Sequence, residues 1–364
     1  MEATYVNIDE SYIGKTVAQD IFANTQHPII AKNTIITPEM LHVLKVFQIS
    51  KVLVFKDGII DKDRSDKEVG SKTVVETIEL VEDSFETYYQ EAVVQFKKEF
   101  ISWQSSAKMD IVKIRGIILP LIEEILKDRT IFFELNNFSN LKDYIYHHCI
   151  ATGLISAVMA HKLGYDKGTV YQLAIAGSLA DSGMSKVPLN IREKKGALNQ
   201  QEYIEIRKHP IYSYQMVKDY PALKDNMKQA IIEHHERLDG SGYPRGLKHD
   251  QISTFSQIIA VADTFHAMTS ERIYRTKESP FKVVEMIKES EFGKFDIKVV
   301  QALMSIVVDL PIGMKVELSN MERGEILFIN KFSPTRPMIK SLKTGEIIDL
   351  SINRNLYILR ILTN

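Results

Sequence analysis

The order of apolar and polar residues divides the chain into stretches of different secondary structure. Between about residues 72 and 127, apolar residues recur every three or four positions, as at Val75, Ile78, Val81, Phe85 and Tyr88. This spacing places their side chains on one face of a helix. We expect two long antiparallel helices that bury these faces against each other.

From about residue 141 to 310 the apolar runs are shorter and the loops are rich in histidine, aspartate and glycine. No alternating strand pattern stands out there, which predicts an all-α region. Strand-like runs with glycine and proline between them occur at 52–55 and again at 316–318, 325–329, 338–342 and 356–361. A short helix is expected at 38–47, and a charged stretch at 61–68 predicts a solvated linker.

These patterns predict a mainly α protein with four parts. An all-α helical bundle at 139–310 is preceded by a small α+β module at 1–62 and by a helical hairpin at 63–138, and a small β module at 311–364 follows it. A length of 364 residues agrees with more than one domain.

Composition narrows the class of protein. Lys and Arg number 46 against 47 Asp and Glu, so no overall positive field favours nucleic acid as a partner. A single cysteine, Cys149, excludes an intrachain disulfide framework. The N-terminus lacks a signal-peptide pattern, and no apolar run is long enough to span a membrane. We expect a cytoplasmic protein.

The candidate chemistry centres on two adjacent histidines, His234 and His235, at the end of an apolar helical run. The loop that follows reads Gly-Ser-Gly-Tyr-Pro at 240–244, and its glycines allow the backbone to approach a ligand closely. Imidazoles at a helix end beside such a loop suit a metal site that stays open to substrate. The alternative is a polar helix C-terminus with a glycine stop.

Further residues of metal-binding type lie on other predicted helices. Asp181 and Asp263 each end an apolar run, and His148 and His209 lie in or beside helical segments. A carboxylate in an apolar environment is costly unless it is paired or bound to a metal, so the two aspartates require a shared positive partner. Nitrogen and oxygen donors together suit iron, manganese or zinc. His147 is expected to be a neighbour of the site, and His266 is a candidate for an outer position around it.

In sequence order these residues resemble the motifs of the HD-GYP domain. The matching residues are His148, Asp181, His209 with Pro210, His234 and His235, the loop residues Gly240, Gly242, Tyr243 and Pro244, and Asp263. The run 268–275, which contains Arg272 and Arg275, also resembles the family, and the resemblance covers about residues 141–310. It implies a metal-dependent phosphodiesterase that hydrolyses cyclic di-GMP to pGpG or GMP, with two or three metal ions that are often iron or manganese.

The resemblance also implies a role for each residue. Asp181 would bridge the metals as the catalytic carboxylate; His209, His234 and His235 would complete one metal position, and His148 and Asp263 would serve the other. Gly240, Gly242, Tyr243 and Pro244 would shape the dinucleotide pocket. Arg272 and Arg275 would contact its phosphates.

The sequence departs from the family pattern at three positions. Ala180 stands where the family has the histidine of its His-Asp motif, and Met184 stands where it has a lysine that holds the scissile phosphate. Tyr144 stands where some members have a third-metal carboxylate. These changes remove one nitrogen donor and one positive charge, so we expect reduced metal occupancy.

Three functions therefore compete. The first is a degenerate member of bacterial second-messenger signalling that binds cyclic di-GMP or a related nucleotide and hydrolyses it weakly or not at all. The second is an active phosphodiesterase, and the third is an interaction scaffold without nucleotide binding. The retained loop and arginines argue against the scaffold, and Ala180 with Met184 argues against full activity. A signalling protein partner and a homodimer are both left open.

Overall fold

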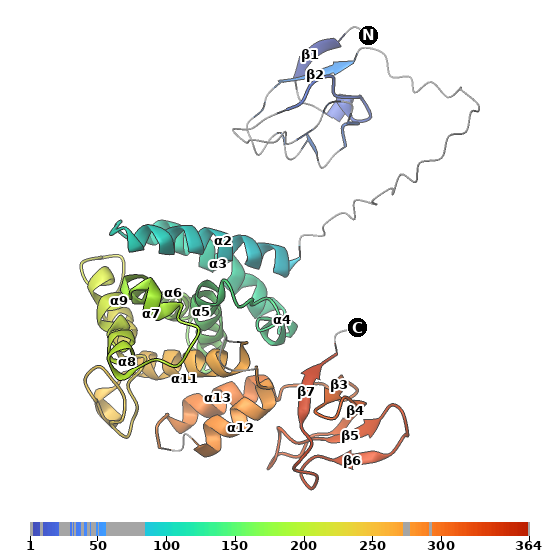
Figure 1. Ribbon diagram of the computed structural model, residues 1–364. Helices are drawn as coiled ribbons and strands as arrows, with labels where there is room; N and C mark the ends of the chain where they lie inside the picture. Colours follow the sequence, from blue (N-terminus) through green and yellow to red (C-terminus); the bar gives the residue numbers. More distant parts are fainter. Residues whose placement is uncertain are drawn as a thin grey trace. The chain divides into compact units, whose positions relative to one another are not determined.

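The computed structural model describes residues 84–271, 277–290 and 293–362, together with scattered stretches of the first 55 residues. The chain separates into two compact units, residues 1–78 and 79–364, which are described separately (Figure 1). The predicted linker at 61–68, the first part of the helical pattern at 72–83 and most of the predicted helix at 38–47 lie outside the described residues.

In the first unit, β1 (Ala3–Asn7) pairs with β2 (Lys51–Phe55) in antiparallel register, with Ala3 opposite Phe55. The 3-10 helix η1 spans Glu10–Tyr12. Val52 and Val54 alternate with more exposed neighbours along β2 and contribute to a small apolar core. The strand predicted at 52–55 is therefore confirmed.

The second unit opens with two helices, α2 (Phe85–Gln104) and α3 (Ile111–Lys127), that pack on each other. Each helix begins after an N-cap residue. The Ser84 hydroxyl accepts from the Thr87 N–H, and the Asp110 carboxylate accepts from the N–H groups of Val112 and Lys113. Trp103, in the last turn of α2, is fully buried. The short helix α4 (Thr130–Glu134) follows.

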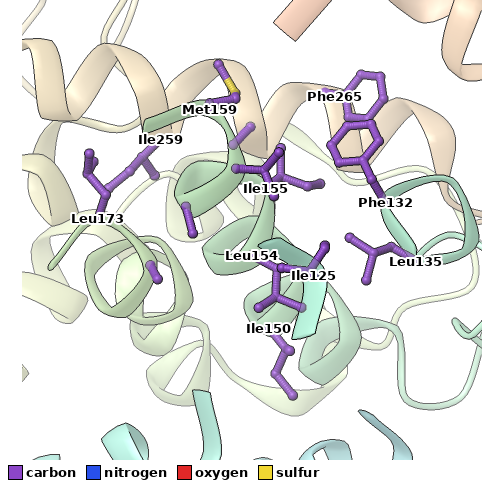
Figure 2. Packing of buried hydrophobic residues seen from close by; sticks show 14 of the residues in the cluster. Ile125, Phe132, Leu135, Ile150, Leu154, Ile155, Met159, Leu173, Ile259 and Phe265 are labelled. Carbon is purple, nitrogen blue, oxygen red and sulfur yellow. The ribbon is translucent and has the colours of Figure 1, made fainter. Parts of the chain in front are cut away.

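The central helix is α5 (Tyr144–Lys162), in which every residue from 146 to 160 is buried. It crosses α6 (Lys167–Ala180) at very short range, because a Cβ on Gly153 would lie 2.0 Å from the Ser178 hydroxyl. Apolar side chains from α3, α4, α5, α6 and α11 fill the space around it (Figure 2). The other elements are η2 (Ser182–Lys186), α7 (Leu189–Arg192), α8 (Gln200–Ile206), α9 (His209–Val217), α10 (Asp225–Glu233), η3 (His249–Gln251), α11 (Thr254–Thr269), α12 (Pro280–Ser290) and α13 (Ile297–Val307).

The C-terminal part is an antiparallel five-stranded sheet in the order β6-β5-β4-β3-β7. Its strands are β3 (Lys315–Leu318), β4 (Arg323–Phe328), β5 (Met338–Ser341), β6 (Ile347–Asp349) and β7 (Ile358–Ile361). The sheet is tied to α12, since the Ser279 hydroxyl donates to the Ile358 carbonyl and the Arg336 guanidinium pairs with Glu285 at 2.6 Å.

The predicted fold class is confirmed: a helical bundle with a small N-terminal module and a small C-terminal β module. One hydrophobic core runs from α2 through the bundle to the sheet, across residues 138 and 310. The domain boundaries placed at those residues stay predictions. Within the described part of the chain, no helix combines the length and apolar character that crossing a membrane requires.

Candidate metal centre

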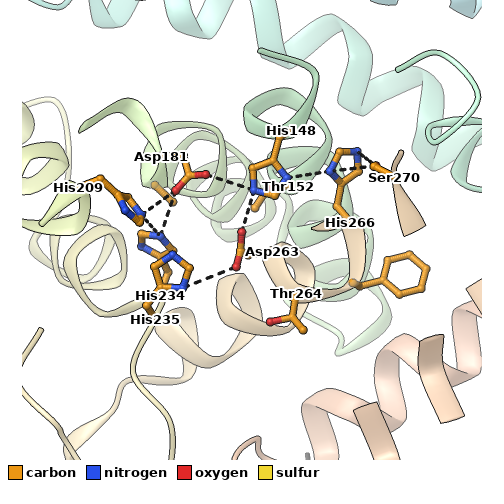
Figure 3. Close-up of polar contacts among 12 residues, drawn as sticks. His148, Thr152, Asp181, His209, His234, His235, Asp263, Thr264, His266 and Ser270 are labelled. Atoms are coloured by element: carbon orange, nitrogen blue, oxygen red, sulfur yellow. Dashed lines mark hydrogen bonds and ion pairs between the residues drawn. The ribbon is translucent and has the colours of Figure 1, made fainter. Parts of the chain in front are cut away.

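The six predicted metal-binding residues lie together in the second unit, five of them at or near the ends of helices and Asp263 in the middle of α11 (Figure 3). His148 is in the second turn of α5, Asp181 follows the last residue of α6, and Asp263 is on α11. His209 begins α9, and His234 and His235 follow α10. Helix ends that are far apart in the sequence therefore converge on the middle of α11.

The donor atoms form two groups that share Asp181. One group joins Asp181 to His209, His234 and His235, and the other joins it to His148 and Asp263; within each group, these atoms lie within 4.8 Å of one another. Asp181 Oδ1 lies 2.9 Å from His209 Nε2 and 3.3 Å from His234 Nε2. Asp181 Oδ2 lies 3.2 Å from His148 Nε2, which is 2.8 Å from Asp263 Oδ1. This is the grouping that the resemblance implied.

The hydrogen bonds of two histidines fit a cation in the first group. His209 Nδ1 lies 2.8 Å from the Ile206 carbonyl, and His234 Nδ1 lies 2.7 Å from the Ile231 carbonyl. A carbonyl only accepts, so both Nδ1 atoms carry protons, and each Nε2 of a neutral ring turns a lone pair toward Asp181 Oδ1. That buried oxygen has no hydrogen-bond partner among the described residues. A metal ion would satisfy all three atoms, and a second hydrogen bond of this kind commonly orients a metal-binding histidine.

The protonation states of Asp181 and His235 are those that a metal ion in the first group requires. Without a metal ion, burial alone would raise the pKa of the Asp181 carboxyl, but the electrostatic attraction of a protonated His209 and a hydrogen bond from His148 hold that pKa well below its usual range. A metal ion held by the neutral rings would take the place of that positive charge. Burial, with the adjacent His234, lowers the pKa of the His235 imidazole well below its usual value. An ionised carboxylate and a neutral imidazole are the forms that bind metals.

His148 has a different balance of forces. Burial opposes its charged form, but hydrogen bonds to Asp181 and Asp263 outweigh burial and raise the pKa of the imidazole to about 9. A metal ion in the second group would have to replace that proton. The second group also offers one nitrogen donor against three in the first.

Two residues around His148 complete its surroundings. His266 on α11 places its Nδ1 2.8 Å from His148 Nδ1, and its Nε2 lies 3.0 Å from the Ser270 hydroxyl. The Tyr144 hydroxyl lies 3.2 Å from the same His148 nitrogen, and the Tyr144 ring stacks on the imidazole. His266 thus lies in the outer position for which it was a candidate.

His147 contacts the Tyr89 ring, and its Nε2 lies 3.3 Å from Asn140 Nδ2.

Asp181 is fixed by the tight turn that follows α6. The Ser213 hydroxyl on α9 donates to the Ala180 carbonyl at 2.6 Å and accepts from the Gly183 N–H at 2.7 Å. A Cβ on Gly183 would lie 2.1 Å from the His209 carbonyl, so only glycine lets the turn come this close to α9. Ala180 is buried, and Met184 is half-buried against the main core.

The loop after α10 is held by a buried acid that the sequence analysis did not single out. The Glu236 carboxylate accepts from the backbone N–H groups of Arg245 at 2.7 Å and Leu247 at 3.0 Å. A Cβ on Gly242 would lie 2.4 Å from the Glu236 Cα, so glycine is required there. These contacts bring Tyr243 over His235, with ring centroids 4.6 Å apart and planes 23° apart.

The remaining predicted pocket residues divide in two. Gly240, with a φ of 83°, and Pro244 lie in the same loop as Gly242 and Tyr243, beside the histidines. Arg272 and Arg275 lie outside the described residues, so their predicted contact with phosphate stays a prediction.

Comparison with known proteins places this geometry in a family. Residues 120–299 match the HD domain family. The chain is 30% identical over 208 residues to cyclic di-GMP phosphodiesterase PdeB of Borreliella burgdorferi, covering 56% of this chain and 54% of that protein. It is 28% identical over 232 residues to cyclic di-GMP phosphodiesterase PA4108 of Pseudomonas aeruginosa, covering 64% and 56% respectively. The chain thus spans about half the length of the curated relatives it matches.

Among solved structures, Bd1817, an HDG"Y"P protein from Bdellovibrio bacteriovorus, aligns with a TM-score of 0.51 at 14% identity, covering 84% of this chain and 99% of that one. At this identity the likeness concerns the fold. The match to the HD domain family covers residues 120–299, just under half of the chain. The resemblance to the HD-GYP group that its motifs predicted is confirmed.

Proposed function

We propose that this chain binds cyclic di-GMP or a related cyclic dinucleotide at the metal centre, as part of bacterial second-messenger signalling, and that it hydrolyses the ligand weakly or not at all. The observation that carries the proposal is the cluster around Asp181, where four imidazoles and two carboxylates face one another beside the glycine loop. Relatives that share this region are cyclic di-GMP phosphodiesterases and a 3'3'-cGAMP-specific phosphodiesterase of Vibrio cholerae, 33% identical over 170 residues.

The cofactor in this proposal is a divalent metal. The mixed nitrogen and oxygen donors suit iron, manganese or zinc, and the resemblance to the HD-GYP domain favours iron or manganese. Asp181, His209, His234 and His235 would hold one ion, and His148 and Asp263 would contribute to a second position with lower occupancy. When bound, such ions activate water and stabilise the charge that develops on phosphate. The chain itself orients His209 and His234 through the carbonyls of Ile206 and Ile231.

Weak hydrolysis follows from the two departures near the shared carboxylate. Ala180 offers no donor atom beside Asp181, and losing even an outer partner of a metal ligand costs about 10 to 100-fold in affinity or activity. Met184 replaces a positive group where charge develops in the transition state, and comparable electrostatic donors contribute roughly 2.7 to 4 kcal/mol. Both losses fall on catalysis, whereas the pocket loop is retained.

An active phosphodiesterase is the second candidate, and one observation favours it. Asp181 belongs to both donor groups, with Oδ1 toward one and Oδ2 toward the other. A shared carboxylate of this kind is what a two-metal hydrolase requires.

The proposed setting of this activity is the cytoplasm, where the chain would act through the dinucleotide and a signalling protein partner, with a homodimer as an open alternative. No nucleic acid partner is proposed, since the net charge is -1.

Calorimetric titration with cyclic di-GMP, without added metal and with manganese or iron, tests the proposal. Binding in the parent protein, together with product formation too slow to deplete the ligand during the titration, is the expected result. His161→Gln is a suitable control, because His161 is an exposed histidine on the same helix as His148. The absence of binding under every metal condition would leave only the scaffold function. Rapid turnover would establish the active enzyme instead.

A further inference from the structure

One arginine beside the metal centre is held by aromatic rings. The Arg207 guanidinium carbon lies 4.3 Å from the centroid of the Tyr243 ring and 5.6 Å from the centroid of the Tyr203 ring. Tyr243 in turn stacks on His235 of the first donor group. Arg207 is therefore the outer layer of a stack that begins at a candidate metal ligand.

The charge of Arg207 is not neutralised by any residue that the structure describes. Its side chain makes ring contacts but no ion pair or hydrogen bond with the described part of the chain, although the side chain is half-buried. Two nearby lysines in the sequence differ: Lys208, the next residue, pairs with Glu205 at 2.7 Å, and Lys194, before α8, pairs with Glu202 at 2.5 Å. A half-buried cation with free donors is prepared for an anion from outside the protein.

Contact with the rings leaves the N–H donors of the Arg207 guanidinium available to an anion. Contact with an aromatic ring uses the flat face of a guanidinium, whereas its five N–H donors point outward in the plane. Ring contact restricts the orientation of the guanidinium, so less conformational entropy of the Arg207 side chain is lost when an anion binds. Planar N–H pairs match two oxygens of a phosphate. The Tyr243 hydroxyl likewise has no partner among the described residues and adds a donor at the same place.

We propose that Arg207, held against the rings of Tyr243 and Tyr203, binds a phosphate group of the cyclic dinucleotide. This inference rests on the proposed function, since it names a further contact in the same pocket. Arg207 is on the segment that joins α8 to α9, two residues before His209, so one short stretch carries both a candidate metal ligand and the proposed phosphate ligand.

The simpler alternative is that the stack only stabilises the loop. A stack with a structural role needs a long side chain between the rings but does not need its charge. Arg207→Met retains a long, polarisable side chain against the rings and removes the charge. Arg207→Lys retains the charge without the planar donors. Lys208→Met is the matched control, because it removes the adjacent cation that Glu205 already neutralises.

Calorimetric titration of the four proteins with cyclic di-GMP, with manganese present, separates the two ideas. Loss of one charged hydrogen bond corresponds to roughly 10-fold weaker binding or more. We expect Arg207→Met to bind about 10-fold or more weakly, Arg207→Lys to recover part of the loss, and Lys208→Met to change affinity less than about 2-fold. The affinity of Arg207→Met should also depend less on salt, because one phosphate contact is gone. Thermal unfolding verifies that all four proteins are folded.

The outcomes distinguish the role of Arg207 from the proposed function. Parent binding together with full affinity in Arg207→Met overturns the role of Arg207 and leaves the proposed function standing. A parent that binds no dinucleotide overturns both. The same titration with cyclic di-AMP distinguishes phosphate from base: for a phosphate contact, Arg207→Met weakens both ligands by a similar factor. A loss confined to cyclic di-GMP would instead assign Arg207 to the guanine edge and refute the phosphate contact.

Discussion

Replacing Asp181 by asparagine removes the charge that both donor groups share while keeping the shape of the side chain. In the structure, Oδ1 faces His209 and His234, and Oδ2 faces His148. An amide has one oxygen and one NH₂ group, so whichever way it turns, one donor group faces an NH₂ in place of a carboxylate oxygen. Asp181→Asn should therefore weaken metal binding at both positions.

The magnitude can be worked out from the ligand count. Losing an outer partner costs up to about 100-fold in metal affinity, so losing a shared ligand should cost at least about 100-fold, or roughly 2.7 kcal/mol. Manganese at about 100 times the parent dissociation constant stabilises the folded protein by about 2.7 kcal/mol, and after a 100-fold loss by only about 0.4 kcal/mol. For a unit of this size, the metal-dependent rise in melting temperature should fall from about 5–10 °C to about 1 °C.

Thermal unfolding of chelator-treated protein, repeated over a manganese titration and accompanied by elemental analysis, measures this change. His161→Gln should behave as the parent, since this exposed histidine lies on α5 away from the cluster. If Asp181→Asn retained the metal-dependent rise of the parent, the assignment of Asp181 as the shared ligand would be wrong.

Four further predictions follow from the same site. Elemental analysis after mild chelation should find fewer than two metal ions per chain, and two full equivalents would contradict the reduced second position. Ala180→His with Met184→Lys should raise hydrolysis of cyclic di-GMP more than either change alone, because both act on one transition state; a parent turnover of about 1 per second or faster would remove the premise. Glu236→Ala should lower stability by roughly 1.5–3 kcal/mol for each of its two charged hydrogen bonds and weaken dinucleotide binding, as denaturant unfolding and calorimetry would measure. Gly242→Ala should lower the melting temperature markedly while Gly196→Ala should not, since a Cβ on Gly196 meets no atom within 4 Å; equal shifts would refute the crowding argument.

The helical bundle could be predicted because the local spacing of apolar residues indicates each helix. The recurrence of apolar residues every three or four positions, as at Phe85 and Tyr88 in α2, marks a helix without knowledge of the rest of the fold. The strand β6 (Ile347–Asp349) was missed, because three residues are too few to show alternation. It forms by pairing with β5, with Ile348 opposite Ile339.

The candidate metal ligands could be recognised because charged or imidazole side chains at the ends of apolar runs are costly without a partner. The groups that support them could not be recognised in the same way. Glu236 reads as an ordinary loop acid, and its role depends on two N–H groups 9 and 11 residues later. His266 meets His148 only because α11 packs on α5, and Arg207 meets Tyr243 only because the loop folds back on α8. Such contacts depend on tertiary packing between distant segments.

Trp103 gives the protein an optical reporter of its own. It is the one tryptophan in the sequence, and it is fully buried beside Phe96 and Phe100. Its carbonyl oxygen accepts from the Lys186 ammonium at 2.5 Å, at the end of the turn that begins just after Asp181. Emission excited at the tryptophan band therefore arises from a single place, where α2 meets the turn that carries Met184. Any rearrangement of that turn on binding metal or nucleotide would change the surroundings of the fluorophore, and it could be followed in the unmodified protein without an attached dye.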